Sequence, residues 1–236
     1  MTLKTFTFYT IVPLFLLASC KDTTNEKKAP VQPQKTIVED TVAVEEKSKE
    51  EEEFVLTEEN AIEFFFNYNK TLKEDTVTLT TNFGDITIEL FDNVPYHKSN
   101  FIYLTKKGYF NNTYFHRIVK NFIIQGGNAD NVETGRKRGQ IGRYLLPPDT
   151  RKGHKHHRGT VSMPSSEIDN PHMLASPFEF FIVVTKPGSY HLDGDYTPFG
   201  KVISGMDVVD KINSQPVGQG DWPIQNVYIL NAKVVK

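Results

Sequence analysis

Apolar and polar residues alternate with a period of two along much of the chain from residue 76 onward. Val77 and Leu79 alternate with threonines, and the same spacing continues through Ile86 and Ile88. This alternation is typical of half-buried strands, and the Asn-Phe-Gly-Asp sequence at 82–85 predicts a hairpin turn between the first two. Six more strands are predicted over residues 114–119, 122–126, 160–163, 178–184, 197–203 and 227–235.

Helical spacing and terminal signals predict three helices, over residues 57–73, 95–107 and 206–212. The first would have Thr57 as its N-cap, with acids near its start and lysines near its end. We expect its apolar face, made of Ile62, Phe65, Phe66 and Leu72, to dock on the domain that follows; the alternative is a helix that binds a partner. Many short strands, few helices and no regular strand–helix alternation predict an all-β protein, either a closed antiparallel barrel or a sandwich.

Composition narrows the class of protein. The chain has 236 residues, of which 38% are hydrophobic and 24% charged, and this excludes a collagen-like, coiled-coil or wholly disordered protein. A single cysteine, Cys20, excludes an internal disulfide framework and a cysteine-rich zinc site. The organisation we expect is a signal segment (1–19), a tether (20–54), an N-terminal helix (55–75) and a compact domain (76–236).

The first twenty residues have the pattern of a targeting signal. Lys4 is the only charged residue before Lys21, and the apolar stretch between them ends in Leu-Ala-Ser-Cys at 17–20. This ending resembles the lipobox of bacterial lipoproteins, which implies acylation of Cys20; the alternative is an ordinary cleaved signal. In that class an Asp after the cysteine marks retention at the inner membrane. Lys21 therefore implies a lipid-anchored protein of the bacterial cell envelope, at the outer membrane.

Charge is divided unevenly along the chain. Residues 20–75 carry 8 Lys or Arg against 15 Asp or Glu, a net of −7, whereas residues 76–236 carry 18 against 14, a net of +4. Residues 21–53 are polar and lack aromatic residues, so they cannot bury enough apolar surface to offset the entropy of ordering. We expect this acidic stretch to be a disordered tether.

One stretch is far more specific than the rest: residues 115–128 read FHRIVKNFIIQGGN. It closely resembles the cyclophilin signature, and four further blocks follow in that family's order, GTVSM at 159–163, FFI at 180–182, LDG at 192–194 and FGKV at 199–202 before GMDVV. The resemblance covers residues 76–236. It implies an eight-stranded closed antiparallel barrel with two capping helices, and peptidyl-prolyl cis-trans isomerase activity.

The residue types suit that chemistry. A prolyl amide rotates over a barrier of about 18–20 kcal/mol because resonance gives its C–N bond double-bond character. An enzyme needs an apolar pocket for the proline ring and a fixed cation that stabilises the twisted amide, and a guanidinium stays charged and presents planar donors. No covalent step and no cofactor are required. Proline-containing polypeptides are the expected partners.

The resemblance implies a role for each residue of the site. Arg117 is the cation, Gln125 orients it and binds substrate backbone, and Ser165 lies where the family binds the peptide main chain. The residues implied to line the proline pocket are Phe122, Ile123, Phe181 and Leu192.

The chain departs from the family at several of these positions. Glu179 stands where glutamine is usual, and a carboxylate there would either pair with Arg117 and weaken its pull on the substrate or select basic residues beside the proline. His191 replaces a common tryptophan, which predicts weak cyclosporin binding, and Tyr196 replaces a common histidine in one pocket wall. Residues 165–177 also differ from the usual peptide-binding stretch. The main alternative is therefore a proline-recognising binding module or chaperone with little turnover.

Residues 136–158 contain eight Lys or Arg, one acid and three histidines. The interpretation we favour is a solvated loop, and a contact with an anionic surface is the alternative. Scarce aromatic residues disfavour nucleic acid. The histidines, without a nearby carboxylate pair, do not predict a metal site. A third hypothesis makes this loop and the N-terminal helix a docking surface. We expect a monomer.

Overall fold

The computed structural model describes residues 54–165 and 170–236 of the chain. The predicted signal segment, Cys20 and all but the last residue of the predicted tether lie outside the described residues. Within the part that is described, none of the helices has the length and apolar character needed to cross a membrane.

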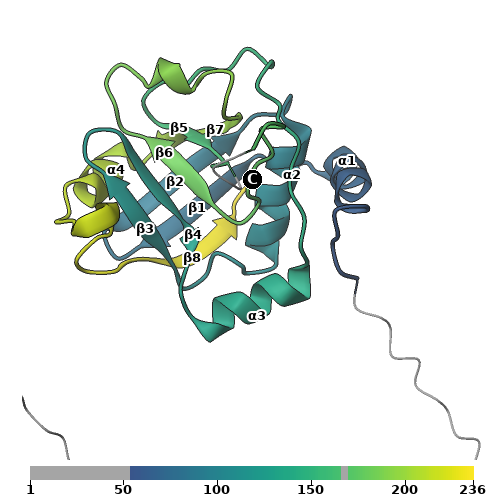
Figure 1. Cartoon of the computed structure of the whole chain (residues 1–236), viewed down its shortest axis with the longest axis horizontal. Helices are drawn as coiled ribbons and strands as arrows, with labels where there is room; N and C mark the ends of the chain where they lie inside the picture. Colours follow the sequence, from purple (N-terminus) through teal and green to yellow (C-terminus); the bar gives the residue numbers. More distant parts are fainter. Residues whose placement is uncertain (1–53, 166–169) are drawn as a thin grey trace, which may run out of the picture. The chain divides into compact units, whose positions relative to one another are not determined.

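Eight strands close into a barrel in the order β1-β2-β7-β5-β6-β4-β3-β8 (Figure 1). Every neighbouring pair is antiparallel. This confirms the predicted closed antiparallel barrel and excludes the sandwich. The strands are β1 (Thr76–Thr81), β2 (Gly84–Leu90), β3 (Thr113–Val119), β4 (Ile123–Asn128), β5 (Thr160–Ser162), β6 (Phe180–Val183), β7 (Pro198–Ser204) and β8 (Val227–Val234).

The apolar residues of the alternating pattern point into the barrel and fill its interior. In the β1–β2 hairpin, Val77 lies opposite Ile88 and Leu79 opposite Ile86, and all four side chains are fully buried. The threonines between them face outward or are partly buried. Burial of these side chains is the main force that holds the strands together, because each fully buried aliphatic side chain contributes about 1.5–3 kcal/mol.

Helices α2 (Pro95–Lys106) and α4 (Met206–Asn213) lie on opposite sides of the barrel (Figure 1). Helix α2 packs against β7 and β8, and α4 packs against β2, β3 and β4. Proline in the first turn of α2 suits a helix start, and Gly108 takes a positive φ of 65° just past its end. These are the two predicted capping helices.

The N-terminal helix begins later than predicted: α1 spans Ala61–Thr71, and Thr57 is not its cap. The side chain of Asn60 accepts the backbone N–H of Thr57 at 2.8 Å, which closes a turn before the helix can start. Helix α1 packs against α2. Phe65 is fully buried there, with its ring 5.9 Å from that of Tyr103. Phe65 therefore docks on the domain as expected, and Leu72 is partly buried against the core. Ile62 and Phe66 do not dock, since they are 37% and 48% exposed, and Phe64 and Tyr68 pack in their place.

Part of the segment predicted as a basic loop is helical, because α3 spans Val132–Ile141. Asn131 caps α3 by accepting the backbone N–H of Thr134 at 2.8 Å. Lys137 donates to two backbone carbonyls in the turn after α2, at 3.0 and 3.1 Å. The interpretation of residues 136–158 as a solvated loop is thus wrong for this part, since Lys137 and Arg138 also attach the helix to the turn after α2.

Candidate active site

A second apolar cluster lies on the outside of the barrel, separate from the interior core. Side chains alternate along β4 and β6, so Ile124 and Ile182 belong to the interior core while Ile123 and Phe181 belong to the outer cluster. The outer cluster consists of Ile123, Phe181, Val183 and Leu192, with Val119, Phe122 and Tyr196 packed against it. An apolar surface of this kind can hold a proline ring.

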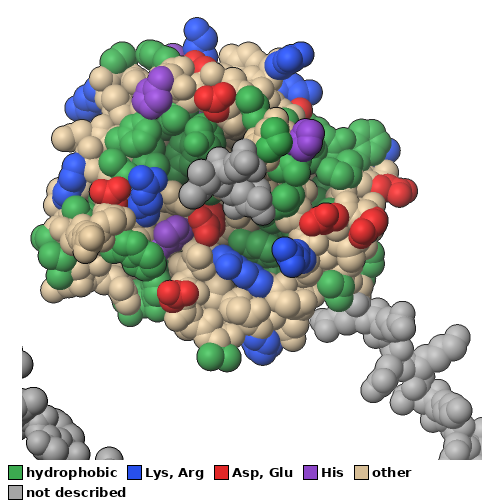
Figure 2. All heavy atoms as spheres, in the orientation of Figure 1, with side chains coloured by type: hydrophobic (Ala, Val, Ile, Leu, Met, Phe, Trp, Pro, Cys, Tyr) green, Lys and Arg blue, Asp and Glu red, His purple; other side chains and the backbone are tan. Residues whose placement is uncertain are grey.

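This cluster forms one side of an open pocket of about 680 Å³. Figure 2 shows hydrophobic side chains gathered on this face of the molecule, bordered by charged side chains and histidine. The pocket brings together all of the predicted substrate-contacting residues except Glu179 and His191. Its lining residues are Arg117, Phe122, Ile123, Gln125, Pro164, Ser165, Asn170, Met173, Phe181, Leu192, Asp195 and Tyr196.

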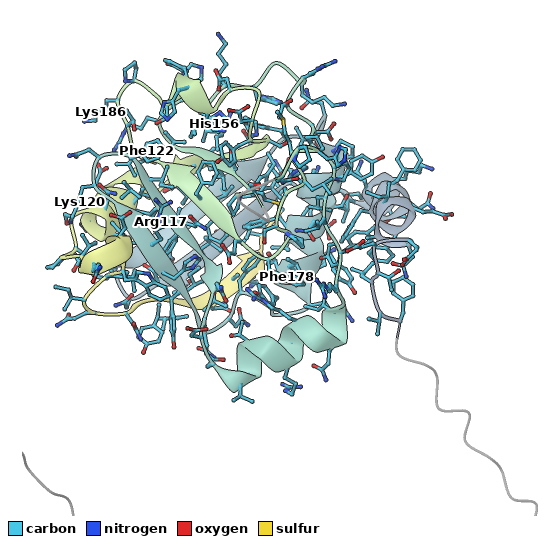
Figure 3. The ribbon with its side chains drawn as sticks, viewed as in Figure 1. Arg117, Lys120, Phe122, His156, Phe178 and Lys186 are labelled. Atoms are coloured by element: carbon cyan, nitrogen blue, oxygen red, sulfur yellow. The ribbon has the colours of Figure 1, made fainter. Side chains whose placement is uncertain are left out.

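Arg117 lies on β3 at the edge of the pocket (Figure 3). It is opposite Gln125 on β4, and Gln125 is opposite Phe181 on β6, so the three residues form one row across the sheet. The Arg117 side chain is 43% exposed, and its Nη2 lies 3.4 Å from Oδ2 of Asp221. Because both partners are exposed, water screens this ion pair and the guanidinium remains accessible to a substrate.

Glu179 does not pair with Arg117, so that expectation is wrong. Its carboxylate instead accepts hydrogen bonds from Gln125 Nε2 at 2.8 Å and Asn128 Nδ2 at 3.1 Å. His116 Nε2 lies 3.5 Å away. Burial acts to raise the pKa of Glu179, but His116 and Gln125 outweigh it and the pKa is lowered. The carboxylate therefore stays charged and fixes the Gln125 amide with its nitrogen toward β6.

The other departures from the family pattern lie around the apolar cluster. The ring of His191 is stacked on that of Phe122, with centroids 5.4 Å apart, and extends the apolar surface outward. Tyr196 meets Phe181 edge to face at 5.6 Å. Ser165 is exposed at the mouth of the pocket and its Oγ accepts a hydrogen bond from Asn170 Nδ2 at 2.9 Å. Residues 166–169 between these two are not described.

Four residues that line the pocket were not among the predicted site residues: Pro164, Asn170, Met173 and Asp195. Two more unpredicted residues contact site residues without lining the pocket. Asp221, which pairs with Arg117, lies in the short helix η2 (Gln219–Asp221) between α4 and β8, 104 positions away in sequence. His156 is fully buried behind Phe181, with the two rings stacked at 6.1 Å. The only sequence signal for His156 was its place among three histidines, a pattern that suggests metal. The described residues contain no group of three or more metal-ligating side chains.

A closed eight-stranded antiparallel barrel with an arginine beside an apolar pocket on its outer face is the arrangement expected of the family that the sequence resembles. Residues 76–234 match the family model described as cyclophilin type peptidyl-prolyl cis-trans isomerase/CLD. The chain belongs to this family.

Individual relatives agree with that assignment. The chain is 39% identical over 166 residues to peptidyl-prolyl cis-trans isomerase-like 2 of Rhizopus delemar, a match that covers 70% of this chain and 30% of that protein. It is 34% identical over 169 residues to peptidyl-prolyl cis-trans isomerase B of Escherichia coli, covering 67% of this chain and 98% of the relative.

A solved structure shows the same fold. The cyclophilin type isomerase of Cryptosporidium parvum is 30% identical, with a TM-score of 0.58, and the match covers 69% of this chain and 98% of that one. That protein has also been crystallised in the presence of the dipeptide Ala-Pro. The protein described here is a cyclophilin-type peptidyl-prolyl cis-trans isomerase. This favours the enzyme over the alternative of a binding module without turnover.

Proposed function

We propose that the pocket on the outer face of β3, β4 and β6 is the active site, and that Arg117 is its catalytic residue. The observation that carries this proposal is that a solvent-accessible guanidinium lines the same pocket as an apolar cluster. The proline ring would enter the cluster, which leaves the preceding amide beside the arginine. Rotation about that amide breaks its resonance, and a fixed cation stabilises the twisted form more than the planar one.

The other pocket residues would bind and orient the substrate. Gln125, held by Glu179, would present its amide oxygen to the substrate or to Arg117, and Ser165 would contact the peptide backbone at the mouth. The Cryptosporidium relative crystallised with Ala-Pro supports proline-containing peptides as the ligand. The residues proposed to enclose the ring and its flanks are Phe122, Ile123, Phe181, His191, Leu192 and Tyr196.

The proposal is tested by the rate of cis-to-trans isomerisation of a short Xaa-Pro peptide. Arg117→Ala is expected to reduce kcat/KM by about 100-fold or more, the usual effect of removing a preorganised stabilising group. The matched control is Arg136→Ala, because Arg136 is exposed on α3, where it bonds only Gln140 among the described residues. A folded Arg117→Ala variant that isomerises the peptide as fast as the control would overturn the assignment.

We also propose that Cys20 is acylated and anchors the enzyme in the outer membrane of a bacterial cell envelope, where it assists the folding of exported proteins. The support is the sequence Leu-Ala-Ser-Cys at 17–20 after a basic residue and a short apolar run, with Lys21 following. Mass spectrometry of the full-length protein purified from membranes should find a mature chain that begins at lipid-bearing Cys20. An unmodified N-terminus, or a membrane fraction unchanged by Cys20→Ser, would contradict the proposal.

Contact of the basic segment with an anionic surface and a monomeric state both stay predictions. Within residues 136–158, exposed cations such as Arg143 and Arg151 remain free to meet an anionic surface, whereas Arg158 is engaged with Asp210 at 2.6 Å. Binding of the domain to vesicles that contain anionic lipid, compared with neutral vesicles, tests the first. Sedimentation of the domain tests the expected monomer.

A further inference from the structure

We propose that His156 is a positioning residue that holds two walls of the proline pocket, Phe181 and the short helix that carries Leu192, in a fixed relation to each other. This inference rests on the proposed function of the pocket. His156 does not itself line the pocket, and it acts from behind the wall. Figure 3 labels it in the upper part of the view, on the same side of the barrel as Phe122.

Both ring nitrogens of His156 are engaged although the side chain is fully buried. Nδ1 lies 2.7 Å from Oδ1 of Asp193, and Nε2 lies 3.0 Å from Oγ of Ser162. Burial lowers the pKa of His156, with Asp193 opposing this effect, so the ring is neutral. A carboxylate can only accept, so Nδ1 carries the proton and donates to Asp193, while Nε2 accepts the Ser162 hydroxyl.

The same residue binds both ends of helix η1 (Tyr190–Leu192). At one end, the backbone carbonyl of His156 accepts the N–H of Ser189 at 2.7 Å. At the other, Oδ1 of Asp193 accepts the backbone N–H of His156 at 2.9 Å in addition to the ring. Leu192, a wall of the proline pocket, therefore stands between two residues that His156 holds in place.

The ring of His156 also supports the opposite wall. Its plane is inclined by only 13° to that of Phe181, with the centroids 6.1 Å apart. Ser162, which donates to the ring, lies opposite Phe181 in the pairing of β5 with β6. A displacement of His156 would thus move the loop wall and the strand wall of the pocket together.

A serine, a histidine and an aspartate in hydrogen-bonded order are also the arrangement of a nucleophilic catalyst. That interpretation fails here because Ser162 is fully buried and does not line the pocket. A hydroxyl that no substrate can reach cannot attack one. The geometry instead suits a support of fixed shape behind the pocket.

Two substitutions test the proposal, one that removes both ring nitrogens and one that restores a donor at the position of Nδ1. His156→Phe keeps a planar ring behind Phe181 but loses both side-chain hydrogen bonds, whereas an Asn amide can imitate Nδ1 and restore the link to Asp193. We expect His156→Phe to raise KM for an Xaa-Pro peptide by about fivefold or more, because a lost buried hydrogen bond corresponds to roughly that factor, with kcat changed less than about twofold. His156→Asn should recover at least half of the loss. His154→Asn is the matched control, since His154 bonds Asn93 and stacks on Phe91, and neither of these residues lines the pocket or belongs to η1.

Peptide affinity measured by calorimetry and the NMR signals of the Leu192 methyl groups accompany the kinetics. A shift of these signals together with weaker binding supports the proposal even if turnover proves low in the parent. Failure of the role of His156 can therefore be distinguished from failure of the proposed active site. If His156→Phe does not fold, Asp193→Ala, which removes the oxygen that accepts both the ring and the backbone N–H of His156, must show the same rise in KM. Unchanged KM and affinity in a folded variant, or a fall in kcat alone, would overturn the inference.

Discussion

His97 on α2 makes the stability of this protein depend on pH in a way that can be calculated. The side chain is fully buried, and neither ring nitrogen has a hydrogen-bond partner among the described residues. Burial alone lowers the pKa of His97 to about 3. In the unfolded chain a histidine titrates near about 6.5. Below that pH the unfolded chain binds a proton that the folded protein excludes.

The sign and size of the effect follow from this difference. Because the folded pKa is the lower one, the stabilisation is complete above about pH 6.5 and is lost as the pH falls from about 6.5 to about 3. Each pH unit in this window costs about 1.4 kcal/mol of unfolding free energy. At pH 5, about 1.5 units below the unfolded pKa, the His97 ring therefore costs about 2 kcal/mol.

Urea unfolding of the parent and of His97→Leu at pH 7 and pH 5 measures this cost. The substitution has its own effect on packing, but that effect is the same at both values of pH, and every other titratable group is shared. We expect the stability of the variant relative to the parent to improve by about 2 kcal/mol between pH 7 and pH 5. A relative stability that does not change with pH would refute the assignment of a buried, neutral imidazole.

Three further predictions follow from contacts in and around the site. Glu179→Gln should change kcat/KM by less than about twofold, because the new amide oxygen can still accept the hydrogen bond from Gln125. Glu179→Leu should lower kcat/KM severalfold, because it leaves the Gln125 amide N–H unpaired. Peptide isomerisation kinetics of the two variants checks both. Asp221→Asn should lower stability by less than about 0.5 kcal/mol, since its ion pair is exposed, while raising kcat/KM at low salt by freeing the guanidinium. Phe65→Ala should cost about 3–5 kcal/mol in urea unfolding, against less than about 1 kcal/mol for the half-exposed control Phe66→Ala.

The barrel could be predicted because its strands carry their signal locally. Alternation along β1 and β2 identifies the inward residues without knowledge of any partner strand. Helix α3 carries no such signal, since Gly135 and Gly139 disfavour a helix and its apolar residues are few. Its stability comes from the Asn131 cap and from Lys137, which bonds carbonyls at the end of α2. The Lys137 contacts join residues 29 and 26 positions apart and exist only in the folded chain.

The residues of the site also fall into two groups, those that a local sequence pattern predicts and those that depend on contacts between distant parts of the chain. Arg117 and Gln125 lie within one short motif on two paired strands, so a sequence pattern was enough to bring them together. Asp221 and His156 reach the site through contacts with residues 104 and 37 positions away, respectively. Nothing beside either residue in the sequence indicates such a contact. His156 in particular lies among cations that favour a solvated loop, and it is buried because Asp193 and Ser162 satisfy its ring.

The most direct test of the central claim separates binding of proline from rotation about its amide in one sample. Exchange NMR of a short Ala-Pro peptide reports both the affinity and the rate of cis–trans exchange in the presence of the parent, Arg117→Ala or Phe181→Ala. We predict that the Arg117→Ala variant still binds the peptide but no longer accelerates exchange, while the Phe181→Ala variant loses affinity. Rapid exchange in the presence of a folded Arg117→Ala variant would contradict the account, because rotation would then not depend on the guanidinium.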